Sequence, residues 1–152
     1  MDMDSDERYM DFALEEAQKA EAAGEVPVGA VIVMDGTVLG RGFNQPISSQ
    51  DPTAHAEMMA LREAARVLKN YRLGSATMYC TLEPCMMCAG AMIHARIARL
   101  VFGTPDPKAG AAGSIYNVLT DPRLNHRVEV ISGVREEACA SLLWNFFSRR
   151  RS

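Results

Sequence analysis

The sequence has no long apolar run, no basic leader and no internal repeat. No stretch reaches the roughly 18 uninterrupted apolar residues that a membrane-spanning helix needs, which argues against an integral membrane protein. Residues 1–7 are mostly acidic and lack the basic region and apolar stretch of a secretory signal, so we expect a cytoplasmic protein. Linkers and low-complexity segments are also missing. We therefore expect one domain over residues 1–152, a length sufficient for its own core.

Cysteine is scarce, with four in the chain. Without an export signal these cysteines are expected to be reduced thiols, which excludes a disulfide scaffold. Cys85 and Cys88 form a C-x-x-C pair, whereas Cys80 and Cys139 lie in apolar segments and are predicted to be buried. No second closely spaced pair is present, so a structural zinc site made of four cysteines is disfavoured.

The most informative feature is a His-x-Glu motif followed by a Pro-Cys-x-x-Cys motif. One imidazole (His55) and two thiolates (Cys85 and Cys88) can occupy three positions around Zn²⁺ and leave the fourth open for water, as in catalytic zinc sites. Glu57 follows the histidine by two residues and is predicted to move the protons of that water. The combination is the signature of zinc-dependent nucleobase deaminases.

The spacing within each motif predicts the local structure. Cys85 and Cys88 are three residues apart and share one face of a first helical turn, where the positive helix end favours thiolates. His55 and Glu57 are two residues apart and would point to nearly opposite sides of a regular helix. We therefore expect His55 at the very start of its helix, with backbone angles that are not helical. Two helix N-termini then converge on one metal.

Each residue taken alone has other roles open to it. A single histidine is commonly a surface or core residue, and a buried glutamate can cap a helix. A redox role of the thioredoxin type accounts for Cys85 and Cys88 but leaves His55 and Glu57 unexplained. The combination favours a catalytic zinc. Zinc chemistry alone does not choose among adenine, cytosine and guanine as the substrate.

Hydrophobic periodicity predicts strands that alternate with helices. Asp35-Gly36 is a two-residue hairpin signal, so the first two strands are antiparallel and the sheet is mixed. Thr53 is the predicted N-cap of the second helix and Pro84 the predicted first residue of the third. The expected fold is a three-layer α/β/α sandwich with a five-stranded mixed sheet. The predicted helices are 6–23, 54–68, 84–95, 115–119 and 135–149, and the predicted strands are 28–34, 37–43, 76–81, 99–103 and 128–131. The expected inward face of the last helix comprises Ala138, Leu142, Leu143, Phe146 and Phe147.

Charge is distributed unevenly along the chain. The net charge is −3, but residues 1–94 carry 7 Lys/Arg against 14 Asp/Glu, while residues 95–152 carry 9 against 5. A basic C-terminal part permits a surface that binds phosphate groups. From the charges alone, a solvated basic C-terminus is the more common explanation.

Five segments resemble those of bacterial tRNA-specific adenosine deaminases, and the resemblance extends from about Tyr9 to Arg150. They are Glu25-Val26-Pro27-Val28-Gly29-Ala30, Gly42-Phe43-Asn44, Asp51-Pro52-Thr53-Ala54-His55-Ala56-Glu57, Thr81-Leu82-Glu83-Pro84-Cys85 with Cys88-Ala89-Gly90-Ala91, and Gly110-Ala111-Ala112-Gly113-Ser114. The resemblance implies a cytidine-deaminase-like fold, one Zn²⁺ per subunit and a homodimer. It also implies an enzyme that converts the wobble adenosine of a tRNA anticodon to inosine.

The same resemblance assigns residues to the RNA substrate. It implies that Asn44 hydrogen-bonds the base and that Val28 lines its pocket. It also implies that Asp106 and Lys108 contact the sugar-phosphate backbone of the anticodon loop. The positions of Phe147 and Arg150 match those that hold flanking nucleotides.

Two other functions stay open from the sequence. A deaminase of a free base or nucleotide (guanine, cytosine or deoxycytidylate) shares both zinc motifs. A zinc-stabilised RNA-binding module without turnover is disfavoured by Glu57 and by the lack of a fourth protein ligand. Without the resemblance, the sequence predicts that Asn44 is a turn residue and that Phe147 is a core residue.

Overall fold

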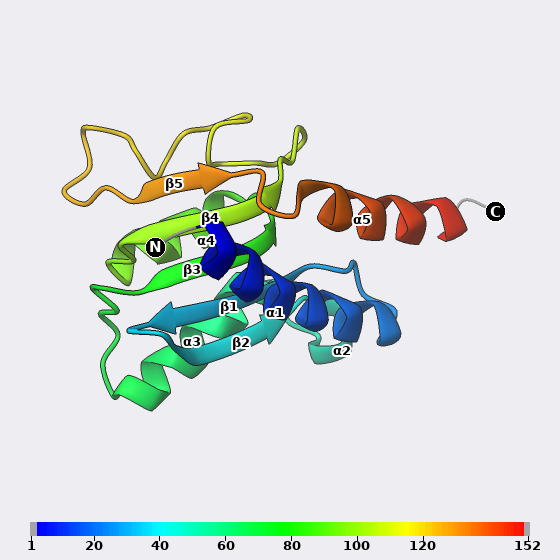
Figure 1. Cartoon of the computed structure of the whole chain (residues 1–152), viewed down its shortest axis with the longest axis horizontal. Helices are drawn as coiled ribbons and strands as arrows, with labels where there is room; N and C mark the ends of the chain where they lie inside the picture. Colours follow the sequence, from blue (N-terminus) through cyan, green and yellow to red (C-terminus); the bar gives the residue numbers. More distant parts are fainter. Residues whose placement is uncertain (1–2, 151–152) are drawn as a thin grey trace.

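A mixed five-stranded sheet forms the middle of the molecule in the computed structural model, which describes residues 3–150 (Figure 1). The strand order is β2-β1-β3-β4-β5, with β1 antiparallel to both neighbours and β3, β4 and β5 parallel. The predicted mixed sheet of five strands is confirmed. The elements are α1 (Met3–Ala22), β1 (Gly29–Met34), β2 (Thr37–Phe43), α2 (Pro46–Ser49), α3 (Ala56–Leu68), β3 (Thr77–Leu82), α4 (Met86–His94), β4 (Arg99–Thr104), β5 (Glu129–Ser132) and α5 (Glu136–Arg150).

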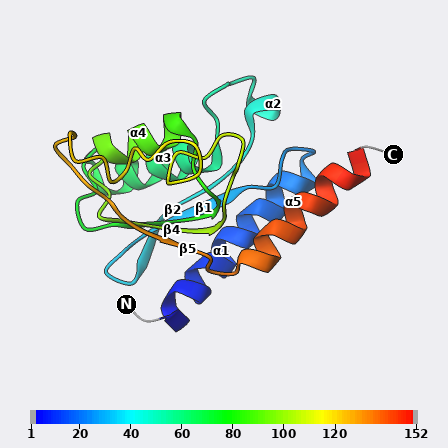
Figure 2. The ribbon, with the colours of Figure 1, turned by 90° about the horizontal axis from the view of Figure 1, so that it is seen from above.

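The helices cover both faces of the sheet. Figure 2 shows α3 and α4 on one face and α1 and α5 on the other. Each face has its own apolar cluster, a larger one under α3 and α4 and a smaller one under α1. This is the predicted three-layer α/β/α sandwich. Among residues 3–150, no helix is long and apolar enough to cross a bilayer.

The hairpin and the central strands follow the sequence pattern closely. Asp35 and Gly36 both have positive φ (51° and 75°), which a two-residue hairpin turn with the twist of the strands requires. The continuous apolar runs of β1 and β3 are buried because helices cover both of their faces. Cys80 and Cys139 are buried, as predicted.

Two predicted helix starts are wrong by two residues. The N-cap of α3 is His55 instead of Thr53, so α3 begins at Ala56; the N-cap of α4 is Cys85, so α4 begins at Met86 and not at Pro84. The Thr53 hydroxyl hydrogen-bonds Asp51 (2.8 Å) in the preceding turn and does not cap the helix.

The predicted helix over 115–119 does not form. The segment turns back on itself, with an isolated antiparallel bridge between Ala112 and Asn117. Ile115 and Tyr116 are 48% and 51% exposed, so no apolar face is buried that would stabilise a helix. The segment between the predicted strand 37–43 and the predicted helix 54–68, for which no helix is predicted, contains the single-turn helix α2.

The inward face of α5 is only partly as predicted. Phe146 is buried and Leu142 and Leu143 are half-buried, but Ala138 and Phe147 are exposed. The reason is that α5 lies along α1 at the edge of the molecule (Figure 2) and buries a narrow stripe.

A buried polar group joins α1 to the sheet. Asp6 is 4% exposed and accepts hydrogen bonds from the Tyr79 hydroxyl (2.7 Å) and from Nη1 and Nη2 of Arg99 (3.0 and 2.6 Å). Burial alone would raise the pKa of Asp6, but the hydrogen bonds from Arg99 and Tyr79 outweigh it and lower that pKa. The ionised carboxylate is therefore favoured in the folded state.

Asp6→Asn is expected to lower the free energy of unfolding at pH 7 by about 3 kcal/mol, because the guanidinium of Arg99, whose side chain is only 13% exposed, stays in place without its counter-charge. A lowered folded-state pKa gives stability that is present above the unfolded value of about 3.9 and is lost as the pH falls through the folded value. The difference between D6N and the wild type should therefore shrink below about pH 4. Urea unfolding at pH 7 and pH 3 measures both. Asp121→Asn, which breaks the exposed pair with Arg123, is the control and should change little.

Candidate active site

The first motif lies where α3 begins. His55 is the N-cap of α3, and its backbone is extended (φ −77°, ψ 154°). Glu57 lies in the first turn of the helix. Because the backbone of His55 is extended and not helical, its side chain is not forced to the side of the helix opposite Glu57. Both residues line one cavity. This is the arrangement that the two-residue spacing predicts.

The second motif lies where α4 begins. Cys85 is the N-cap, with extended backbone (φ −79°, ψ 177°), and Cys88 lies buried in the first turn. A hydrogen bond from the Cys88 thiol lowers the pKa of Cys85 to about 3, and the same bond raises the pKa of Cys88. At neutral pH the pair therefore carries a thiolate, which is the form that binds metals.

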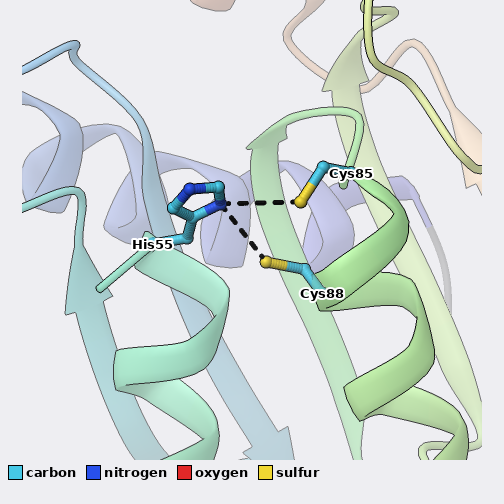
Figure 3. A group of neighbouring side chains, drawn as sticks. All are labelled: His55, Cys85 and Cys88. Atoms are coloured by element: carbon cyan, nitrogen blue, oxygen red, sulfur yellow. Dashed lines mark hydrogen bonds between the residues drawn. The ribbon is translucent and has the colours of Figure 1, made fainter. Parts of the chain in front are cut away.

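The imidazole and the two sulfurs face one another (Figure 3). Nδ1 of His55 lies 3.5 Å from Sγ of Cys85 and 3.6 Å from Sγ of Cys88. In a tetrahedral zinc site with ordinary bond lengths, a nitrogen and a sulfur ligand are about 3.6 Å apart. The three ligand atoms all lie within 4.8 Å of one another. Both the donor types and their spacing fit a zinc ion.

Glu57 lies beside these groups but is not one of the three. It is 4% exposed, and burial raises the pKa of its carboxyl group. A raised pKa makes the protonated form of Glu57 easier to reach than that of an exposed glutamate, which suits a group that must act as both acid and base.

A cavity of about 180 Å³ opens at the N-terminal ends of α3 and α4. Asn44 and Val28 reach it from the open ends of the β1–β2 hairpin, where the backbone N–H of Asn44 donates to the Val28 carbonyl (3.0 Å). The predicted site residues that line this cavity are Val28, Asn44, His55, Glu57, Cys85 and Asp106.

Comparison with known proteins agrees with this geometry. Residues 3–104 match the family model of the cytidine and deoxycytidylate deaminase zinc-binding region. The chain is 54% identical to the tRNA-specific adenosine deaminase of Haemophilus influenzae over 147 residues, which are 96% of this chain and 85% of that protein. It is 48% identical to the Bacillus subtilis enzyme of the same name, over 98% of this chain and 92% of that one. The chain belongs to the tRNA-specific adenosine deaminase family.

Solved structures support the same family. A structure from studies of A-to-I editing by tRNA:A34 deaminases at the wobble position of transfer RNA has a TM-score of 0.86 and 44% identity, covering 90% of this chain and 99% of that one. A guanine deaminase from Nitrosomonas europaea has a TM-score of 0.83 at 23% identity, over 93% of this chain and 84% of that one. At that identity the second likeness shows the shared fold only. The matched zinc-binding region includes all three candidate ligands of this deaminase-family chain.

The remaining predicted RNA contacts lie outside the first cavity. Lys108 and Phe147 line an adjoining cavity of about 400 Å³, and Asp106 lines both. Arg150 lines neither: its guanidinium donates to the Gly24 carbonyl (2.7 Å) and lies 4.4 Å from the centre of the Phe146 ring. In this structure Arg150 therefore joins α5 to the end of α1.

Sequence reasoning missed four residues of the first cavity, namely Val26, Leu82, Glu83 and Ala109. Glu83 had the clearest signal, because an acidic residue stands two positions before Cys85 in an otherwise apolar strand end. The role of Glu83 depends on its contact with a loop more than 20 residues further along the chain, and the local sequence pattern does not predict that contact.

Proposed function

We propose that this protein is a zinc-dependent deaminase that converts adenosine to inosine at the wobble position of a tRNA anticodon. The observation that carries the proposal is the buried Glu57 beside the His55, Cys85 and Cys88 group in a chain 54% identical to a tRNA-specific adenosine deaminase. In this proposal residues 1–152 form one deaminase domain, which holds one Zn²⁺ through those three ligands.

The ligands and Glu57 divide the chemical work. A zinc ion bound there supplies Lewis-acid activation of a water molecule at neutral pH. Glu57 accepts a proton from the attacking water and delivers it to a ring nitrogen of adenine, which makes the amino-bearing carbon more electrophilic. The oxygen of the water bonds to that carbon, and Glu57 passes the second proton of the water to the amino group as the C–N bond breaks. The products are ammonia and inosine, so the reaction is a hydrolysis.

The cavity walls select and orient the base. Asn44 presents a side-chain amide that can donate to and accept from a base edge, and Val28 contributes an apolar wall. Asp106, Lys108 and Phe147 follow along the adjoining cavity, where neighbouring nucleotides of a single strand would lie. Arg150, in its present contact with Gly24, would have to move to reach RNA.

The test is incubation of zinc-loaded protein with a short RNA hairpin that carries adenosine at the wobble position. We expect a mass gain of about 1 Da confined to that adenosine, since an amino group is replaced by an oxygen. Hairpins with the adenosine one position away should stay unchanged. Efficient turnover of free guanine, cytidine or adenosine would instead favour the small-molecule deaminase.

The proposal includes the assembly and the location of the protein. We propose a homodimer in the cytoplasm, where tRNA is found. An apolar groove of about 290 Å³ between α3 and α4, lined by Met58, Leu61 and Ala91 among others, supports a protein partner on that face.

A further inference from the structure

A second buried carboxylate stands at the edge of the cavity, and the chemistry above does not use it. Glu83 follows β3 and is 2% exposed. Among residues 3–150 it has no ion pair with a lysine or arginine. A buried carboxylate without a counter-charge is costly unless hydrogen bonds satisfy it.

All of its side-chain hydrogen bonds come from one distant loop, residues 105–114. Oε1 accepts from the Asp106 amide (2.9 Å) and from the Ser114 hydroxyl. Oε2 accepts from the amides of Ala112 (2.9 Å) and Ser114 (3.0 Å). Both ends of the loop therefore converge on one carboxylate.

The loop wraps closely around that carboxylate. A Cβ atom at Gly110 would overlap the carboxylate group of Glu83, so only glycine allows this approach. The Ala111 amide also donates to the Pro84 carbonyl (2.8 Å), next to the candidate ligand Cys85. The loop is thus attached directly to the segment that leads into the second metal-binding motif.

The loop also forms a wall of the substrate site. Asp106 and Ala109 line the cavity that contains Glu57. Lys108, with Pro105 and Pro107, lines the adjoining cavity. Moving the loop would therefore move the predicted RNA contacts Asp106 and Lys108, whereas all three candidate metal ligands lie outside the loop.

We propose that Glu83 is a positioning residue for substrate binding: its carboxylate holds the 105–114 loop in the conformation that receives the RNA. The inference rests on the proposed function. It assigns to Glu83 a contribution to RNA affinity and none to proton transfer.

Glu83→Gln tests the role with little change in volume. Glutamine replaces one acceptor oxygen with an NH₂ group, so in either orientation at least one backbone N–H of the loop faces another donor. With the zinc-loaded enzyme and the RNA hairpin, we expect KM to rise about tenfold or more, with kcat within about threefold and bound zinc unchanged. Hydrogen exchange at the amides of Asp106, Ala112 and Ser114 should become faster.

Two further variants separate positioning from general damage. Gly110→Ala leaves the carboxylate intact but displaces the loop, and should reproduce the rise in KM. Glu16→Gln is the matched control, because Glu16 is also a buried carboxylate (3% exposed) but lies on α1 and accepts from Lys19 (2.8 Å). Its KM should equal that of the wild type.

Several outcomes would overturn the inference. An unchanged KM in E83Q would do so, and so would a loss of zinc or a fall in kcat at constant KM, since each places the role elsewhere. Unchanged hydrogen exchange at the loop amides in E83Q would mean that Glu83 does not hold the loop in place. A wild-type protein that leaves the hairpin unmodified would instead overturn the proposed function, and amide exchange, which needs no substrate, tells the two failures apart.

Discussion

Glu57→Gln is expected to lower kcat for RNA deamination by at least about 10³-fold, because an amide cannot carry the two protons that the reaction moves. The substitution is nearly isosteric, and Glu57 is not among the three candidate ligands, so zinc content and thermal stability should stay close to those of the wild type. Single-turnover inosine formation, scored by mass, measures the loss, and metal analysis measures the zinc.

The ligand variant Cys88→Ser provides the contrast for that experiment. It should lose zinc and activity together, since a hydroxyl is a much poorer zinc ligand than a thiolate. If E57Q lost zinc to the same extent as C88S, Glu57 would be part of the metal site and its assignment as a proton carrier would be wrong. If E57Q kept its activity, another group would move the protons.

Gly42→Ala is expected to destabilise the protein by about 3 kcal/mol or more, because the new Cβ meets backbone that cannot rotate aside. Gly42 lies on β2 directly under α3, and its Cβ would fall 2.6 Å from the Ala60 nitrogen and 2.8 Å from Met59 Cβ. A shift of α3 also displaces His55, so zinc affinity should fall as well. Urea unfolding and zinc titration measure the two effects.

Gly74→Ala is the control for the packing argument. A Cβ at Gly74 has no atom within 4 Å, so its free energy of unfolding should stay within about 0.5 kcal/mol of the wild type. Equal stability of G42A and G74A would mean that α3 does not sit against β2 as described.

Much of the fold could be predicted because its signals are local. The turn at Asp35-Gly36 and the apolar runs of β1 and β3 specified the mixed sheet, since turn chemistry and burial act over a few residues. The prediction of a helix over 115–119 was wrong because the conformation of this segment depends on a contact with a residue far away in the chain. Its apolar residues have the spacing of a helix. The backbone amides of Ile115 and Tyr116 instead donate to the Gly110 carbonyl, within the loop whose Ser114 amide donates to Glu83.

The chemistry of the candidate centre could be predicted from the amino-acid sequence. His55, Glu57, Cys85 and Cys88 could be singled out because a metal requires particular donor atoms at particular spacings, and such spacings are visible in the chain. The spacing even predicted the extended backbone at His55.

The surroundings of that centre depend on the three-dimensional packing. It brought Glu83 to the 105–114 loop, exposed Phe147 and turned Arg150 towards Gly24. These placements depend on how α5 and a long loop pack against elements far away in the chain. Such packing is set by the fit of many side chains at once, and no short pattern in the sequence records it.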